Sequence, residues 1–560
     1  MPPIQWADFL QGFQRYPGGI FEASLQNPSK SDWLRRERLW LLGLFAAALI
    51  LRLYYLHALA QTPFFEPLSP TLDDGVYDLR GLEIAAGAWL GKPSWLVYTT
   101  PLYPYFLGLI YRIFGHSIGT AHLIQTCLGA FTPLLVYALA KKAFNSRRVP
   151  IIAGAMAAVY VPFIFYENML LGESVSIFLM LCALRLLVRA LGQADGALRA
   201  YFPAGLLFGI TALLRPNITV PVISCAIFLG LYLASKKNSR GLGAAAALLL
   251  LAGHATGVSP ITLKNYRLYK DFVPVAAHGG VNFYMGTNPQ KGGGWHAAAG
   301  LGTGMKELVD NSVVVAERAQ GRPLKPSEVS AYWTAKAFDN IRGSPWGFLK
   351  LLLRRTAYFL NRYEYPDTIN MLFVAEFIPL LKLGAFAFGV VAVLAIGGLV
   401  FRRRQWSVAA TLLAIFALCY AAPVGVIGVV SRYRVPIVPI LIIFAASGLD
   451  CAWDCWLKRD RGRLLKFCAL CALTSVLVFY PVRHLRFAVP YNALGIYFDQ
   501  KGLWLKAENC YRKALEISPN FPDPYHNLFL LYRNLGDMEK ALTFEQKYQM
   551  LKAAALAAGT

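Results

Sequence analysis

Charged residues are scarce in this chain. Only 15% of its 560 residues are charged, whereas soluble proteins carry about 25%. Hydrophobic residues make up 56%, and many of them fall in runs close to the 20 or so residues that a membrane-spanning helix needs. The composition therefore excludes an ordinary soluble domain and predicts an all-α polytopic membrane protein.

Two familiar signals are missing. The first 30 or so residues contain Pro2, Pro3 and Pro17 and no apolar core, so we expect no cleavable signal peptide. The glycine run Gly292–Gly294 is not followed by the Gly-Lys-Ser/Thr of a nucleotide-binding loop. A nucleotide or nucleotide-sugar site is therefore not expected.

The nine cysteines are an odd number and do not suggest a disulfide framework. Cys451, Cys455, Cys468 and Cys471 have a spacing that weakly resembles a zinc ribbon. The last two, however, lie at the start of an apolar run, and no glycine-rich knuckle accompanies the pairs. Helix packing is the interpretation that we favour for these four residues over metal binding.

Basic residues are abundant, since 55 Lys and Arg face 31 Asp and Glu and the net charge is +24. They occur in short clusters between the apolar runs, which is typical of cytoplasmic loops and not of a nucleic-acid-binding face. We therefore expect no nucleic-acid partner. The clusters are Arg35–Arg38, Lys141–Arg148, Arg185–Arg199, Lys236–Arg240, Arg402–Arg404 and Lys458–Lys466.

If all six clusters are cytoplasmic, the chain alternates consistently through about eleven spans, with its N-terminus inside and its C-terminus outside. The expected spans are roughly residues 40–56, 118–139, 149–166, 174–192, 201–215, 218–235, 241–258, 376–401, 407–430, 435–450 and 464–481. Pro101–Gly115 is short and aromatic-rich, so we expect it to lie on the membrane surface.

These spans divide the chain into a cytoplasmic segment (1–37), a membrane domain (38–484) and a tail (485–560). The membrane domain has two long external loops, at about 57–117 and 259–372. Five features of the tail recur after 34 residues, a period typical of tetratricopeptide repeats and hard to explain by an unrelated helical hairpin. The pairs are Pro490-Tyr491 with Pro524-Tyr525, Leu494 with Leu528, Gly502 with Gly536, and Ala507 with Ala541.

Two repeats are few for independent stability. We therefore expect the tail to lean on the membrane domain, another subunit or a protein partner.

Acidic residues gather on the expected outer side. Asp73, Asp74 and Asp78 follow the first span, and Glu167 and Glu173 lie at the outer ends of the third and fourth. Glu173 begins an apolar run, where an acid is costly unless it is paired or functional. Converging carboxylates suit a general base or a bound cation. For Asp74 and Glu167, however, we favour the interpretation that they are solvated loop acids.

Basic residues on that side are unusual, because loops outside the cytoplasm carry few of them. Arg432, Tyr433 and Arg434 lie between two spans, and Arg215 and Lys264 lie at the outer ends of others. Guanidinium groups bind phosphate oxygens bidentately, so these positions favour a phosphate site. The alternative is that they reach out to lipid headgroups.

Taken in order, these motifs resemble the membrane glycosyltransferases of the GT-C fold, in particular the family 39 branch of protein O-mannosyltransferases and aminoarabinose transferases. The segment from Asp73 through Tyr77 and Asp78 to Gly87 is similar to that family's catalytic loop. Other segments that carry the resemblance are Pro101–Tyr105, Tyr166–Glu173, Arg215–Asn217, Asn282–Gly286, Asn361–Glu364 and Arg432–Pro439. Many members have Asp-Glu where this chain has Asp73-Asp74.

The resemblance implies an inverting glycosyl transfer from a polyprenyl-phosphate sugar to an acceptor hydroxyl on a protein, lipid or glycan. It places the reaction at the outer face of the cytoplasmic (inner) membrane. Asp73 would be the general base, and Glu173 would support the acceptor or a divalent cation. Phosphate ligands would be Arg432, Arg434, Arg215 and Lys264, and supporting residues Asp74, Tyr77, Asp78, Glu167, Asn282 and Tyr433.

Two other functions remain open on the sequence. A flippase or exporter of lipid-linked sugars would also be polytopic and basic, but its site would lie near the bilayer midplane. A membrane-anchored tetratricopeptide scaffold would have no need of acids within its membrane part.

Overall fold

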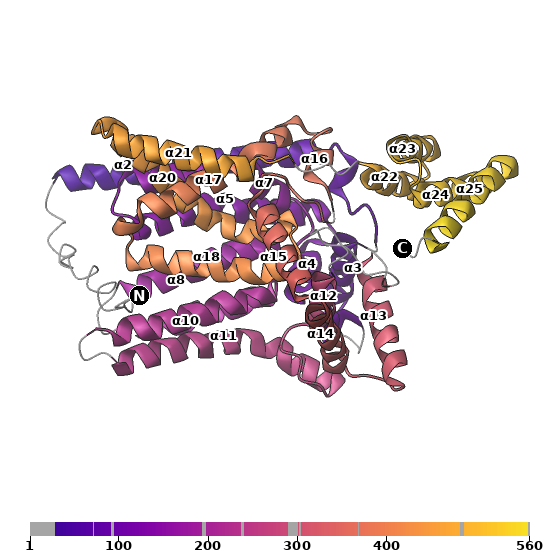
Figure 1. Ribbon diagram of the computed structural model, residues 1–560, viewed down its shortest axis with the longest axis horizontal. Helices are drawn as coiled ribbons and strands as arrows, with labels where there is room; N and C mark the ends of the chain where they lie inside the picture. The colour runs from indigo at the N-terminus through magenta and orange to yellow at the C-terminus, as the bar shows by residue number, and fades with distance from the viewer. Residues whose placement is uncertain are drawn as a thin grey trace.

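The computed structural model describes residues 28–557 except 71, 91–94, 193–197, 237–239, 289–300, 302–303, 368 and 482–486. Every regular element in those residues is a helix. Long helices run side by side, short helices cover one end of this bundle, and the tail projects from that end (Figure 1). The predicted all-α fold is confirmed, while the glycine run Gly292–Gly294 lies outside the described residues.

Eight helices in the described ranges are long and apolar enough to cross a membrane, which confirms a multi-pass membrane protein. A ninth span results if α6 (Arg148–Ala158) and α7 (Val161–Glu167), which are bent by 49°, count as one. The eight contain α2 (Pro28–Leu59), α5 (Ile118–Ala143), α8 (Glu173–Leu191), α10 (Thr219–Ala234), α11 (Arg240–Tyr269), α17 (Gly384–Phe401), α18 (Val408–Ile427) and α20 (Val438–Leu457).

The two remaining predicted spans are helical but differ from the eight. Helix α9 (Leu198–Ala212) has only 15 residues, and α21 (Arg461–Val478) carries three basic residues in its 18. Helix α11 is longer than predicted, because it continues through Pro260 to Tyr269. The helix therefore extends ten residues into the segment that the sequence predicted as the second external loop, from about residue 259.

A buried arginine stabilises the interruption between α6 and α7. Arg52 of α2 is fully buried and donates to both carboxylate oxygens of Glu167, at 2.7 and 3.1 Å. It also donates to the carbonyl of Ala158, the last residue of α6, at 3.1 Å. A carbonyl at a helix end has no partner within its helix, so Arg52 stabilises this interruption in the bundle.

The short helices at the tail's end of the bundle include the predicted surface helix. It is α4 (Leu102–Phe114), with 13 residues, or about 20 Å, which is too short for a hydrocarbon core of about 30 Å. The others are α3 (Asp73–Ala85), α12 (Gly279–Thr287), α13 (Met305–Gln320), α14 (Pro326–Gly343), α15 (Pro345–Leu360), α16 (Met371–Val374) and α19 (Ser431–Arg434).

The tail forms two helical hairpins, α22 (Ala488–Gln500) with α23 (Trp504–Ile517), and α24 (Pro522–Asn534) with α25 (Met538–Ala557). The recurring glycines Gly502 and Gly536 both have positive φ, 71° and 81°, a conformation that glycine adopts without strain. Their recurrence therefore marks the same turn in each hairpin.

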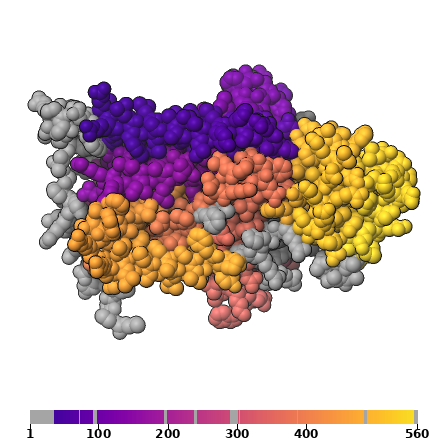
Figure 2. All heavy atoms as spheres, turned by 90° about the horizontal axis from the view of Figure 1, so that it is seen from above, coloured from indigo at the N-terminus to yellow at the C-terminus, as the bar shows by residue number. Residues whose placement is uncertain are grey.

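The first hairpin of the tail docks on the membrane domain, as Figure 2 shows. The ring of Tyr491 lies 4.8 Å from that of Phe373, and its hydroxyl lies 3.0 Å from Glu376. Lys501 pairs with Glu66 at 2.7 Å. The membrane domain thus supplies support that two repeats alone lack.

The Arg52–Glu167 pair yields the first prediction. Glu167→Ala should lower the free energy of unfolding by about 3–5 kcal/mol, because it leaves a buried guanidinium without its carboxylate. Thermal unfolding of the purified protein in detergent measures the loss. Glu66→Ala is the control, since an exposed pair contributes about 0–1 kcal/mol. Equal effects of the two variants would contradict the structural role given to Glu167.

Candidate active site

A cavity of about 330 Å³ lies between the ends of the long helices and the short helices, as the elements that line it show. Its wall combines residues from α3, the start of α8, the turn before α10, the start of α12, the end of α18 and α19. Seven of the predicted site residues line it, namely Asp73, Tyr77, Glu173, Arg215, Asn282, Arg432 and Tyr433.

Arg432 is the centre of an ion-pair network in this cavity. One terminal nitrogen, Nη1, lies 2.7 Å from Asp73 and 2.9 Å from Asp367, and its Nε lies 3.0 Å from Glu173. Arg215 also pairs with Glu173. Three carboxylates and two guanidinium groups therefore meet at one place, although they come from segments far apart in the sequence.

The charged groups stand at helix ends. Asp73 and Glu173 are the first residues of α3 and α8, where the positive end of a helix dipole stabilises a carboxylate. Arg432 belongs to the single turn α19, which directly precedes η6 (Val435–Ile437) and α20. The network thus sits where membrane helices begin and end, which allows polar groups at the boundary of an apolar bundle.

Aromatic and amide side chains complete the wall. The ring of Tyr433 lies 5.3 Å from the guanidinium carbon of Arg215 and 5.5 Å from that of Arg432, within the range of cation–π attraction. The hydroxyl of Tyr77 lies 3.1 Å from that of Thr100. Together with Asn282, these groups offer hydrogen bonds suited to a polyhydroxylated substrate.

Two of the predicted acids on α3 lie away from the cavity wall. Asp74 is buried, and burial raises the pKa of its carboxyl to about 7. Asp78 accepts a hydrogen bond from Tyr111 at 2.6 Å and lies 3.0 Å from Nε2 of His116, so it joins α3 to α4 and its following turn. Glu167, as described above, pairs with Arg52.

Two of the predicted phosphate ligands also lie outside the cavity. Lys264 donates to the hydroxyl of Tyr105 at 3.0 Å and lines a separate hollow of about 30 Å³. Arg434 pairs with Glu364 at 2.9 Å and donates to the carbonyls of Asn361 and Tyr363 at 2.7 and 3.0 Å. Side chains two residues apart on a helix differ by about 200°, so Arg432 and Arg434 point in different directions.

Asp367 and His278 are among the wall residues that sequence reasoning did not single out. Asp367 follows the Asn361–Glu364 motif by three residues, and His278 directly precedes the Gly279-Gly280 pair. Burial lowers the pKa of His278 to about 4, so its ring is neutral near pH 7. The only feature of the sequence that could have pointed to Asp367 was its position close to the Asn361–Glu364 motif.

The described part of the chain contains no group of three or more His, Cys, Asp or Glu placed to hold a metal ion. The three carboxylates of the cavity surround Arg432 instead. Cys451 and Cys455 are buried in α20 as free thiols, and Cys468 and Cys471 are free thiols on α21.

Arg434 yields the second prediction. Arg434→Ala should lower the free energy of unfolding by about 3–5 kcal/mol, because it leaves the buried Glu364 unpaired. The carbonyls of Asn361 and Tyr363 would also lose their donor. Thermal unfolding in detergent measures this, with the exposed Arg404→Ala as the control. An Arg434→Ala protein as stable as the control would show that the segment Asn361–Glu364 does not depend on this side chain.

Comparisons with known proteins agree with the resemblance seen in the sequence. Residues 98–261 match the family "Dolichyl-phosphate-mannose-protein mannosyltransferase", and residues 510–543 match the tetratricopeptide repeat. No curated protein matches the chain.

Two solved structures are similar to the chain at low identity. One is the oligosaccharyltransferase AglB of Archaeoglobus fulgidus in complex with an inhibitory peptide and a dolichol-phosphate, at 14% identity and a TM-score of 0.42. That match covers 88% of this chain and 59% of the archaeal one. The other is ArnT of Cupriavidus metallidurans bound to undecaprenyl phosphate, at 14% identity and a TM-score of 0.31, covering 73% of this chain and 78% of that one.

The family match supports glycosyltransferase activity. Over residues 98–261 the chain is therefore similar to the dolichyl-phosphate-mannose-protein mannosyltransferase family, and over residues 510–543 its tail is similar to the tetratricopeptide repeat.

Proposed function

We propose that the protein transfers a sugar from a polyprenyl-phosphate-linked donor to an acceptor hydroxyl, with inversion, at the outer face of the cytoplasmic membrane. The observation that carries this proposal is the meeting of a carboxylate and two guanidinium groups in one cavity at the end of a membrane bundle. The description of the matched family names a dolichyl-phosphate sugar, which supports a lipid-phosphate donor.

Asp73 is the proposed general base. Its carboxylate would accept the proton of the acceptor hydroxyl while that oxygen forms a bond with the anomeric carbon. The bond from that carbon to the phosphate oxygen breaks on the opposite side, and the electron pair leaves with the lipid phosphate. Asp73 lines the cavity and its side chain is 22% exposed, so a substrate hydroxyl can reach it.

Arg432 and Arg215 are the proposed phosphate ligands. Negative charge grows on the departing phosphate, and fixed guanidinium groups stabilise it in the transition state. Glu173 contacts both guanidinium groups, so in this proposal it positions the arginines. Lys264 and Arg434 make other contacts, and the proposal does not depend on them.

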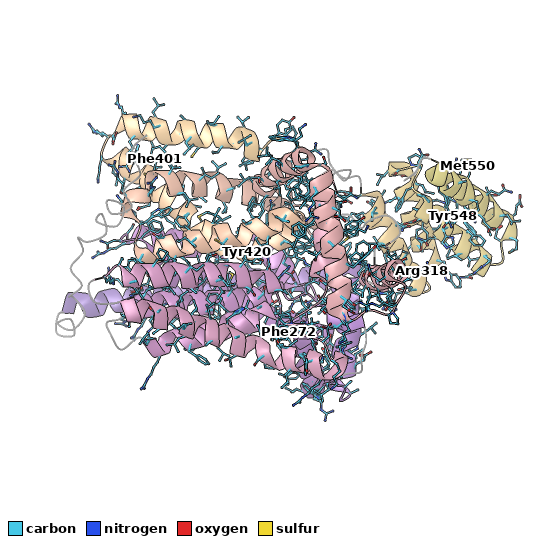
Figure 3. The ribbon with its side chains drawn as sticks, turned by 60° about the horizontal axis from the view of Figure 1, so that its bottom comes forward. Phe272, Arg318, Phe401, Tyr420, Tyr548 and Met550 are labelled. Carbon is cyan, nitrogen blue, oxygen red and sulfur yellow. The ribbon has the colours of Figure 1, made fainter. Side chains whose placement is uncertain are left out.

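The outer face is proposed from the distribution of basic residues. Phe401 lies at the end of the bundle opposite the tail (Figure 3), and the basic cluster Arg402–Arg404 follows it directly. Positive clusters favour the cytoplasmic side, which puts the tail and the cavity on the other side. A site at the end of the bundle also favours an enzyme over a carrier, whose site lies near the midplane.

Replacement of the base yields the third prediction. Asp73→Asn keeps the size of the side chain and removes its basicity, so transfer should fall by about 10²–10⁴-fold. Asp74→Asn should be milder, because Asp74 does not line the cavity. Transfer from a purified lipid donor, assayed at matched protein levels, compares the two variants. If both remain fully active, the proposed reaction is wrong.

Replacement of the phosphate ligand yields the fourth prediction. Arg432→Ala should weaken transition-state binding by about 1.5–3 kcal/mol, the contribution of a hydrogen bond to a charged group. Arg432→Lys should restore activity only in part, because an ammonium cannot form the planar fork. The measurement is kcat/KM for the donor. Full activity in the lysine variant would argue against bidentate phosphate binding.

A further inference from the structure

The cavity has an unfavourable charge balance for the donor proposed above. Its wall carries the carboxylates of Asp73, Glu173 and Asp367 against the guanidinium groups of Arg215 and Arg432. His278 adds no positive charge near pH 7, because burial lowers its pKa to about 4. A lipid phosphodiester brings one further negative charge. Binding it therefore requires that one carboxylate lose its charge or leave Arg432.

The three carboxylates differ in how readily they can lose their charge or leave Arg432. Glu173 contacts both guanidinium groups and its side chain is only 2% exposed. Asp73 has to remain ionised if it is to act as the base. Asp367 contacts the same nitrogen of Arg432 as Asp73, at 2.9 against 2.7 Å, and its side chain is 18% exposed. Burial, and then the nearby charge of Asp73, raise the pKa of Asp367, while Arg432 opposes this rise.

We propose that Asp367 takes up a proton when the donor binds, so that Arg432 exchanges its bond to this carboxylate for a bond to the phosphate. The inference rests on the proposed function. The proton comes from solvent and binds a carboxylate oxygen of Asp367. The N–H of Arg432 that pointed at Asp367 then points at a phosphate oxygen. When the lipid phosphate leaves, Asp367 returns the proton to solvent and pairs with Arg432 again.

The sign of the pH dependence follows from this exchange. Donor binding is favoured while Asp367 holds a proton, so affinity is highest at low pH and falls as the pH rises through the raised pKa of Asp367. The other charged or titratable groups around the network include Asp73, Asp74, Glu173, Arg215, Arg432, His278, Tyr77, Tyr98, Tyr103, Tyr166, Tyr420 and Tyr433. Among these, Asp74 has a pKa of about 7 and needs a control of its own.

A binding experiment on the full-length protein in detergent tests the proposal. The probe is the methyl phosphodiester of a short polyprenol, which has no second ionisation of its own in the working range of about pH 5.5–8.5. For the wild-type protein, the Kd should rise by up to about tenfold per pH unit, as expected for uptake of one proton. Asp367→Asn resembles the protonated side chain, so its Kd should be nearly independent of pH.

The variants separate charge from structural damage. At the highest pH, Asp367→Asn should bind the probe more tightly than the wild-type protein, by up to about tenfold for each pH unit above the pKa of Asp367, which a damaged site would not do. Asp367→Glu keeps the titratable group and should keep the pH dependence, as should Asp74→Asn.

The remaining outcomes are decisive in different ways. A flat Kd for the wild-type protein, or pH dependence lost in Asp74→Asn and kept in Asp367→Asn, would overturn the inference and leave the proposed transfer standing. A wild-type protein that binds no probe at any pH would overturn the proposed donor, and this inference with it.

Discussion

Pairing of buried guanidinium groups is the interaction on which this bundle depends. A charge in an apolar interior is costly unless an opposite charge or hydrogen-bond acceptors meet it. Arg52 meets Glu167, and Arg434 meets Glu364. Arg402 follows Phe401, which lies at the end of the bundle opposite the tail (Figure 3), and it lies 2.8 Å from Asp450 and 2.7 Å from Asp454.

The cavity also contains contacts between a guanidinium group and carboxylates, but these contacts are accessible to a ligand. Arg52 and Arg434 each pair with one carboxylate, whereas Arg432 contacts three carboxylates beside an accessible space. Such an arrangement is stable without substrate, yet each contact can be exchanged for one to a ligand. The pairing of guanidinium groups with carboxylates, which stabilises the bundle elsewhere, can therefore bind an anion in the cavity.

Sequence reasoning predicted the fold and seven residues that line the cavity, because both leave local signals in the sequence. Apolar runs and basic clusters predicted the helices, and an acid at the start of an apolar run, Glu173, pointed to the cavity. It could not assign Glu167, because its partner Arg52 lies 115 residues away. It also could not separate Arg432 from Arg434, since their difference arises from rotation within the one turn of α19.

The docking of the tail has a consequence for how the protein would handle a large acceptor. Phe64 lies nine residues before Asp73, the first residue of α3, and its ring centroid lies 5.8 Å from that of Phe373, which in turn packs on Tyr491 of the tail. Lys501 holds the same segment through Glu66. A module on a flexible linker samples a volume that depends on the length of the linker. The docked tail instead has one fixed position relative to the membrane domain. The distance between the repeats and the cavity is therefore fixed. An acceptor chain bound by the repeats would present to the cavity only residues at that distance from its bound segment.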